Sequence, residues 1–452
     1  MTPLSCRALL STSRTLLNES DMTTVVLMGS LDTKGEEFGY ARHCIRELGA
    51  NTIMIDTGTL GAPTVAPDVP ASAVAEAGGA NLDELRAAGD RASMLTAMID
   101  GATAIVKNLY ADGSLDAAFG LGGSNNTAVA AAVFRTLPLG VPKLILTTMA
   151  AGNVRRIVGA SDLMLAASVV DIAGLNHVSR VVIANAAAAV TGMAQAKTPP
   201  APGANRPVVA CSMIGLTTRA VTAGRRRLEE LGYEVVVFHM TGVGGIAMED
   251  FIDTGSVVGV LDLTTSELAD ELQDGICSAG PGRLTSAARH GVPQVVAPGG
   301  LDMINFGPAE TLPSRLAGRV THVHNAEVTL VRTNAAECAE LGRRIAERAQ
   351  GGREDGAGAS TETDRLPTTC AIVLLPSGGL SAIDVAGQSF HDPTASAALA
   401  DAVRAHATPG RLRIVDIEGN LDQPAVGVAA ANLLHELIQA RMAGRNTYQP
   451  EQ

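Results

Sequence analysis

The sequence predicts an α/β protein with two doubly wound parallel sheets, one in each half of the chain. Short apolar or β-branched runs alternate with alanine-rich stretches of helical character. Such runs, without polar alternation, are typical of parallel strands that are buried on both faces. A proline- and glycine-rich break interrupts the pattern at residues 196–207, and the pattern then restarts in a similar form. We therefore expect two related lobes joined by a linker, with a cleft between them.

Composition restricts the class of protein further. The chain has 452 residues, of which 46% are hydrophobic and only 2% aromatic. Its net charge of −12 disfavours binding to nucleic acid, because phosphate backbones are neutralised by lysine and arginine. Proteins that bind single strands also stack bases on aromatic side chains, which are scarce here. We expect no nucleic-acid partner.

Cysteine usage and hydropathy predict the compartment. The 6 cysteines lie far apart and form no C-x-x-C pair, which disfavours a zinc site or a disulfide framework and fits a reducing cytosol. The longest apolar region, SVVDIAGLNHVSRVVIANAAAAVTGM, contains Asp171, Asn176, His177 and Arg180. Crossing a bilayer with these residues would be costly. We expect a cytoplasmic protein that does not enter a membrane.

Residues 1–22 are expected to be a disordered extension outside the fold. They contain Arg7 and Arg14 and no acidic residue before Glu19, which loosely resembles a transit peptide. The alternative is that translation begins at Met22, directly before the first apolar run.

The first lobe is predicted over residues 23–195. Its strands are expected in the apolar runs TTVVLMG, NTIMID, DAAFGL and PKLILTT. The second lobe is predicted over residues 208–452, with a small, polar and mobile loop at residues 350–369. Its strands are expected in PVVACSM, YEVVVFHM, SVVGVLDL, PQVVAPG, EVTLVRT, CAIVLLP and RLRIVDI.

The first candidate site follows the first strand, in GSLDTKGEE. Ligands of doubly wound sheets bind at the carboxyl ends of the strands. A helix beginning near Gly35 would direct free N–H groups and its positive dipole end at an anion. Lys34 would add a charge, Thr33 a hydroxyl, and Asp32 an oxygen ligand suited to Mg²⁺. The alternative interpretation is an ordinary helix start that Asp32 or Thr33 caps.

Two further strand ends in the first lobe have the same character. The segment DAAFGLGGSNNTAV predicts a strand, a glycine-rich loop and a helix, which together favour phosphate or another anion. A third strand, PKLILTT, is followed by MAAGNV. The candidate residues at these two ends are Gly122, Gly123, Ser124, Asn125, Asn126, Thr127, Thr148 and Asn153.

The second lobe has its own candidates for a cleft ligand. Gly244 and Gly245 lie between a strand and a helix, and Asp302 and Asn305 follow a later strand. His324 lies in HVHN, where its spacing from the other histidine puts both on one face of an extended segment. No third metal ligand follows at a fixed spacing, so a surface strand is the favoured interpretation of HVHN. We expect the Gly122–Thr127 loop and the Asp302–Asn305 loop to border the cleft from opposite sides.

The motifs together resemble one family. They occur in the order GSLDTKGEE, GLGGSNNT, LTTMAAGNV, SVVDIAGLN, GVLDLTTSELADEL, SAGPGRL, VPQVVAPGGLDMINFGP, HNAEVTLVRT and LLPSGGLSAIDVAGQSFHDP. This combination is similar to the Tm-1-like ATP-binding family, over roughly Thr24 to the end of the chain. The resemblance implies Rossmann-like lobes, ATP and Mg²⁺ bound by the first lobe, and a homodimer. It places nucleotide contacts among the first-lobe candidates, with Asp32 at the metal.

Two functional hypotheses follow. In the first, the protein is an ATP-dependent enzyme that couples the nucleotide to a small polar metabolite bound between the lobes, because two facing lobes can close over both ligands and exclude water. In the second, it is a non-catalytic, ATP-responsive binding or regulatory protein. ATP turnover in the presence of cell metabolites would separate them.

Overall fold

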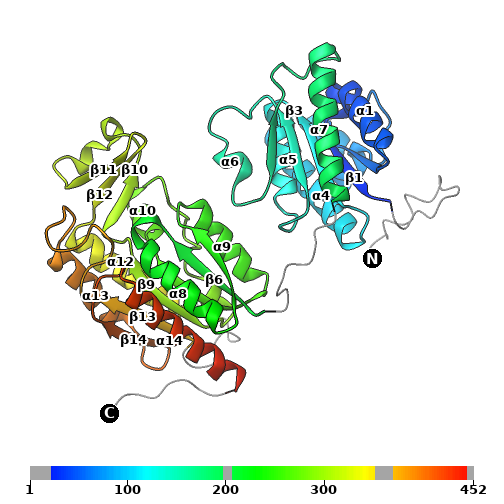
Figure 1. Cartoon of the computed structure of the whole chain (residues 1–452). Helices are drawn as coiled ribbons and strands as arrows, with labels where there is room; N and C mark the ends of the chain where they lie inside the picture. Colours follow the sequence, from blue (N-terminus) through cyan, green and yellow to red (C-terminus); the bar gives the residue numbers. More distant parts are fainter. Residues whose placement is uncertain (1–21, 197–205, 352–369, 445–452) are drawn as a thin grey trace. The chain divides into compact units, whose positions relative to one another are not determined.

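The computed structural model describes residues 22–196, 206–351 and 370–444. The predicted extension, most of the linker and most of the polar loop lie outside these residues. The chain divides into two compact units, the first ending at Pro199 and the second beginning at Pro200 (Figure 1). Each unit contains its own parallel sheet, so the predicted fold class is confirmed. Within the described residues, no helix is both long enough and apolar enough to span a membrane.

The sheet of the first unit has five strands in the order β2-β1-β3-β4-β5, and all of its pairs are parallel. The four predicted strands form, and β5 is a short strand that the sequence pattern did not predict. The bounds are β1 Thr24–Gly29, β2 Asn51–Asp56, β3 Ala117–Gly122, β4 Lys143–Thr147 and β5 Met164–Ala167.

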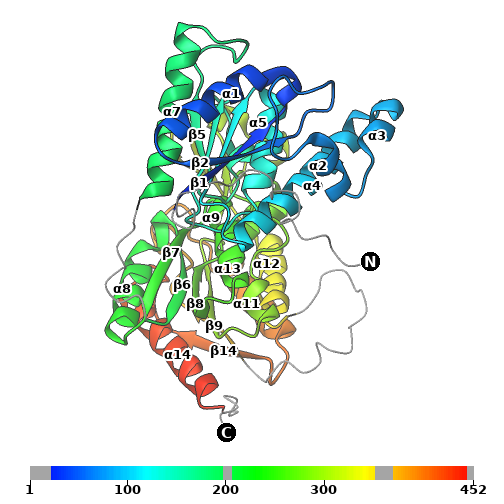
Figure 2. The same ribbon diagram turned by 90° about the vertical axis from the view of Figure 1, so that its right-hand side faces the viewer.

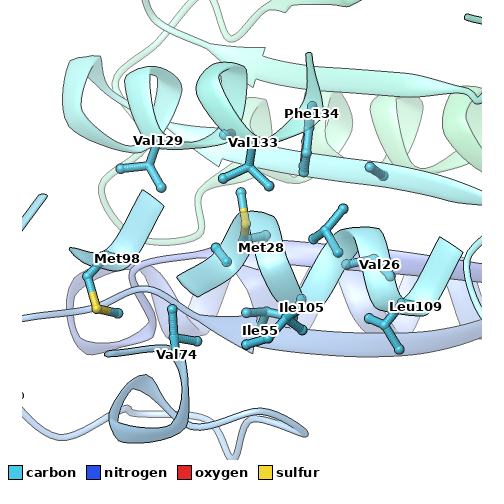
Figure 3. Packing of buried hydrophobic residues seen from close by; sticks show 14 of the residues in the cluster. Val26, Met28, Ile55, Val74, Met98, Ile105, Leu109, Val129, Val133 and Phe134 are labelled. Carbon is cyan, nitrogen blue, oxygen red and sulfur yellow. The ribbon is translucent and has the colours of Figure 1, made fainter. Parts of the chain in front are cut away.

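Helices cover both faces of this sheet. One core cluster joins the sheet to α1 and α7, and another joins it to α2, α4 and α5. Figure 3 shows the second cluster, with Met28 and Ile55 of the sheet packed among helix residues such as Val133. The bounds are α1 Leu31–Glu47, α2 Ala71–Ala77, α3 Leu82–Ala88, α4 Arg91–Ala111, α5 Ser124–Phe134, α6 Arg155–Val158 and α7 His177–Gln195.

The second unit repeats this strand order with one strand added. Its parallel sheet has the order β14-β13-β9-β8-β6-β7. Read from β7, the sheet begins with the second strand of the unit along the chain, followed by the first, the third and the later strands, as in the first unit. Figure 2 shows β6, β7, β8 and β9 edge to edge. The bounds are β6 Val208–Met213, β7 Glu234–His239, β8 Val257–Thr264, β9 Gln294–Gly299, β13 Ala371–Pro376 and β14 Leu412–Ile417.

The helices of the second unit also lie on both faces. One core cluster contains α8 and α14, and two others contain α9 and the pair α12 and α13. The bounds are α8 Thr218–Glu230, α9 Val243–Asp253, α10 Glu267–Gln273, α11 Ser286–Arg289, α12 Ala335–Ala349, α13 Pro393–His406 and α14 Pro424–Met442.

One strand of the second unit corrects the sequence prediction. The run EVTLVRT was expected in the parallel sheet, but it forms β12 (Val328–Arg332) in a separate antiparallel sheet. Its partners are β10 (Met303–Phe306) and β11 (Thr321–Asn325). Only Ala326 and Glu327 join β11 to β12. So short a connection permits an antiparallel pair and not a parallel crossover.

Candidate functional site

The carboxyl ends of β1 and β3 form the topological switch point of the first sheet. In this strand order, the connection from β1 leads to β2 on one side and the connection from β3 leads to β4 on the other, which is the arrangement at which doubly wound sheets generally bind ligands. Ser30 directly follows β1, and its hydroxyl donates to Oδ1 of Asn126 at 2.7 Å. Since Asn126 lies in the first turn of α5, the N-termini of α1 and α5 are within reach of one side chain.

The N-terminus of α5 is open. Its N-cap residue is Gly123, and no side chain of the described residues caps the helix. Ser124 and Asn125, the first two residues of the helix, are exposed. Gly122 has a φ of 145°, and a Cβ at that position would approach the Asn126 side chain to 2.7 Å. The free N–H groups of the first turn and the helix dipole are the features that favour an anion at a helix terminus.

Thr127 and Asn126 hold this loop in place through hydrogen bonds. The Thr127 hydroxyl donates to the Gly123 carbonyl at 2.8 Å and lies 2.6 Å from the Thr147 hydroxyl. Asn126 is buried, and its amide donates to the Leu121 carbonyl at 3.3 Å. These two predicted site residues therefore fix the loop with the same groups that were expected to reach a ligand.

Thr148 and Asn153, also predicted, are exposed beyond the end of β4. The side-chain oxygen of Asn153 accepts from the Arg155 N–H at 3.1 Å, at the start of the short helix α6. Thr148 is joined to the β3 end through its own N–H, which lies 3.4 Å from the Gly122 carbonyl. Thr148 therefore lies on the strand next to the open helix.

The N-terminus of α1, in contrast, is filled by the protein itself. Asp56, the last residue of β2, accepts from the Leu31 N–H at 3.0 Å and from the Gly58 N–H at 2.8 Å. Burial raises the pKa of Asp56, and these two N–H groups oppose that increase. A carboxylate therefore occupies the position at which the sequence suggested a ligand anion.

Asp32, the predicted metal ligand, uses only one of its oxygens. Oδ2 accepts from the N–H groups of Leu60 and Gly61 at 2.8 and 3.1 Å, which anchors the loop after β2. Oδ1 is buried and has no hydrogen-bond partner among the described residues. A Cβ on Gly58 would lie 2.7 Å from Cγ of Asp32, so the carboxylate lies directly against that backbone.

The other residues of GSLDTKGEE differ in exposure. Thr33 is exposed and Lys34 is partly exposed. Lys34 interrupts the helix with a φ of −130°, and its ammonium group forms no ion pair within the described part of the chain. Gly35 is buried, and a Cβ there would overlap the Thr64 hydroxyl. Gly35 is therefore explained by contact with the chain's own loop.

Thr57 is a site residue that was not predicted from the sequence. Its N–H donates to the Gly29 carbonyl at 2.9 Å and so continues the β1–β2 ladder, which places Thr57 beside Ser30. Side chains alternate along a strand, and Ile55 lies on the face of the sheet that α2, α4 and α5 cover, so Thr57 is on that face as well. It is 5% exposed, and its hydroxyl has no partner among the described residues. Its only sequence signal was its place one residue after a strand.

In the second unit, the predicted glycines contact the chain itself. A Cβ on Gly244 would overlap the His239 carbonyl, and one on Gly245 would overlap the Glu267 carboxylate. The Glu267 Oε1 accepts from the N–H groups of Gly242 and Gly245 at 2.6 and 3.1 Å. These glycines allow a close internal approach.

Asp302 and Asn305 are both buried. Asp302 accepts from the Ser381 hydroxyl at 2.6 Å, and its other oxygen has no partner among the described residues. Burial, together with the neighbouring charge of Asp384, raises the pKa of Asp302 to about 6. Asn305 donates to Asp270 at 2.8 Å, so its amide is engaged.

His324 lies on a different strand from Asn305. It is exposed on β11, in the antiparallel sheet. No group of three or more metal-ligating side chains occurs in the described residues.

Comparisons with known proteins cover both units. The N-terminal domain of an uncharacterised protein family (UPF0261) matches residues 23–199, and the C-terminal domain of that family matches residues 206–438. A UPF0261 protein of Clostridium tetani (strain Massachusetts / E88) is 38% identical over 415 residues, which cover 92% of this chain and 99% of that protein. The UPF0261 protein RA0729 of Rhizobium meliloti (strain 1021) is 37% identical over 410 residues, covering 90% and 98%.

A plant protein is similar over a shorter region. The ToMV resistance protein Tm-1(GCR237) of Solanum lycopersicum is 39% identical over 290 residues. The match covers 63% of this chain and 36% of the plant protein.

Proposed function

The chain belongs to the uncharacterised protein family UPF0261, and on that premise we propose that its first unit binds ATP together with Mg²⁺. The tomato relative confirms the Tm-1-like resemblance of the motifs. The nucleotide itself is a proposal that rests on the geometry of the β1–β3 switch point and on that resemblance.

One observation carries the proposal: the open N-terminus of α5 and an unpartnered hydroxyl, that of Thr57, both lie next to Ser30 at the end of β1. Thr57 is only 5% exposed, and it lies on the α5 face of the sheet with an Oγ1 that no described residue contacts by a hydrogen bond. A buried hydroxyl without a partner is costly unless a ligand or water supplies one. Phosphate oxygens at the α5 terminus would accept from this hydroxyl and from the helix N–H groups.

Two charged residues at the end of β1 fit the same ligand. The ammonium of Lys34 has no ion pair within the described residues, so it is available for phosphate oxygens. The free Oδ1 of Asp32 is the hard oxygen that Mg²⁺ prefers, and magnesium commonly uses one or two carboxylates together with substrate phosphates. The donor set therefore fits magnesium, which would neutralise phosphate charge when bound.

The proposal has two forms. In the first, the protein is an ATP-dependent enzyme whose second unit binds a small polar metabolite, which the unpartnered oxygen of Asp302 favours. In the second, ATP binding regulates a non-catalytic protein. Release of ADP or AMP on addition of a metabolite extract supports the first form, and ATP binding without turnover supports the second.

Lys34→Ala tests the binding proposal. A charge-assisted hydrogen bond contributes roughly 1.5–3 kcal/mol, so the variant should bind Mg·ATP on the order of ten- to a hundredfold more weakly in isothermal titration calorimetry. Lys107→Ala is the matched control, because Lys107 is an exposed lysine on α4 of the same unit. Equal affinities for all three proteins would remove Lys34 from the site, and a wild type that binds no ATP would refute the proposal.

A further inference from the structure

The second unit has the same strand order as the first, but the α-helix that follows its first strand already receives a carboxylate of the chain. The helix that follows its first strand is α8, and the Arg219 N–H in its first turn donates to Oδ1 of Asp422 at 2.9 Å. The guanidinium of Arg219 lies 3.8 Å from the other oxygen. Asp422 is 6% exposed. A buried carboxylate therefore takes the place that a phosphate would need.

The next helix, α9, is filled in the same way. Glu267 accepts from the N–H groups of Gly242 and Gly245 at the start of α9, and it is completely buried. Its second oxygen accepts from Nε of Arg283 at 2.7 Å. Both oxygens of this carboxylate are thus fixed, and the glycine that they contact leaves no space for another group.

The remaining helices at this edge have acidic side chains in or next to their first turns, which disfavour an anion there. The first turn of α10 carries two buried acids, Glu267 and Asp270. The helix α14 begins with Pro424, which has no N–H, and it follows Asp422 by two residues. The helix α13 is capped by Asp392, which accepts from the Ala395 N–H at 3.0 Å.

We propose that the ligand of the second unit carries no phosphate group and is uncharged or cationic. This inference rests on the proposed function for the existence of that second ligand. In the first unit the α5 terminus is open and has no acidic residue in its first turn, whereas each α-helix that starts at the carboxyl edge of the second sheet has an acidic side chain in its first turn, at its cap or two residues before it. The unused oxygens at this edge, on Ser266 and Asp302, accept hydrogen bonds from hydroxyl or amino groups. The protein therefore holds one phosphate chain, in its first unit.

Binding stoichiometry tests the inference. Calorimetry on the full chain with Mg·ATP, and separately with inorganic tripolyphosphate, should give one site per chain for each probe, weakened ten- to a hundredfold by Lys34→Ala. Two sites per chain would overturn the inference. A single site that Lys34→Ala leaves unchanged, and that a substitution in the second unit removes, would overturn it as well. No binding of either probe would instead refute the proposed function.

Two substitutions at Asp422 test why the second unit excludes phosphate. Asp422→Gly frees the N–H groups of α8 and should add a second, weaker tripolyphosphate site. Asp422→Asn retains an oxygen that can accept from the Arg219 N–H, so this variant should still bind one tripolyphosphate per chain. A folded Asp422→Gly protein that still binds one tripolyphosphate would contradict this role of Asp422. If that variant does not fold, the wild-type stoichiometry still decides the inference.

Discussion

At the scale of single residues, the same residue types serve different purposes in the two units. Gly35 and Gly245 were predicted as site residues, but each makes room for an oxygen of the chain itself. Gly123 has no such internal neighbour, since a Cβ there would meet only Thr148 at 3.9 Å among the described residues. The sequence places all of these glycines after strands, and only the three-dimensional packing separates them.

The sequence made Asp302 a candidate and missed Thr57, and in neither case could it indicate that an oxygen lacks a hydrogen-bond partner. Thr57 and Asp302 are ordinary polar residues near strand ends, and what distinguishes them is a missing hydrogen bond in the folded protein. Asp56 and Thr57 are adjacent in sequence, yet alternation at the end of β2 turns Asp56 toward α1 and Thr57 toward the face that α2, α4 and α5 cover. The face of the sheet to which each side chain points therefore decides whether it caps α1 or stays without a partner.

The raised pKa of Asp302 makes the free energy of unfolding depend on pH. The pKa of Asp302 is raised to about 6 by burial, against about 3.9 in an unfolded chain. Between these values the folded state binds more protons than the unfolded state, so this group's contribution to stability is complete below about pH 4 and falls as the pH rises to about 6. A pKa difference of one between the two states corresponds to about 1.4 kcal/mol of unfolding free energy.

Asp302→Asn removes this titration and keeps an acceptor for Ser381. Urea denaturation of both proteins from about pH 4 to 7 should find the variant gaining about 2–3 kcal/mol relative to wild type over that range. A difference in unfolding free energy that stays constant with pH would contradict the assignment to Asp302.

At the scale of elements, the sequence predicts where strands form, but it does not always predict which sheet a strand joins. Apolar runs identified β1 to β4 and the parallel strands of the second unit, because buried parallel strands are apolar throughout. The strand β12 has the same apolar character, but its two-residue link to β11 puts it in an antiparallel sheet. The strand β5 is only four residues long and partly exposed, so its pattern is weak.

Helix ends are a second element-scale feature, and Asp56 caps α1 from a different strand. Asp56→Ala would leave the buried Leu31 N–H without its acceptor, and loss of a helix cap costs about 1–2 kcal/mol. Chemical denaturation should register that loss, whereas Asp56→Asn, which retains an acceptor oxygen, should stay closer to wild type. If alanine and asparagine were equally stable, the carboxylate of Asp56 would not be capping α1.

At the scale of the whole molecule, two units of equal strand order differ in how their helix termini are used. The similar starts of the two halves predicted the repeat, and both sheets follow it. Carboxylates from distant positions, Asp422 at α8 and Glu267 at α9, occupy two helix termini of the second unit. Asp422 and its partner Arg219 are 203 residues apart, so no local motif could indicate that contact. We therefore propose the first unit as the phosphate site, because the α5 terminus is open there while carboxylates occupy the α8 and α9 termini of the second unit.

Closing that terminus is the most direct test. Gly123→Asp places a carboxylate at the N-cap of α5, where the backbone φ is −83° and a Cβ has space. An aspartate N-cap should leave stability equal or raise it by up to about 1 kcal/mol. The control Gly123→Ala fits the same space without a charge or an acceptor.

The measurement is the affinity of the full chain for Mg·ATP by calorimetry in wild type, Gly123→Asp and Gly123→Ala. We predict that the aspartate variant is folded and binds at least about a hundredfold more weakly, since a carboxylate repels the phosphate from the helix terminus. The alanine variant should stay within about tenfold of wild type. A folded Gly123→Asp protein that binds Mg·ATP as tightly as wild type would show that the α5 terminus is not the phosphate site.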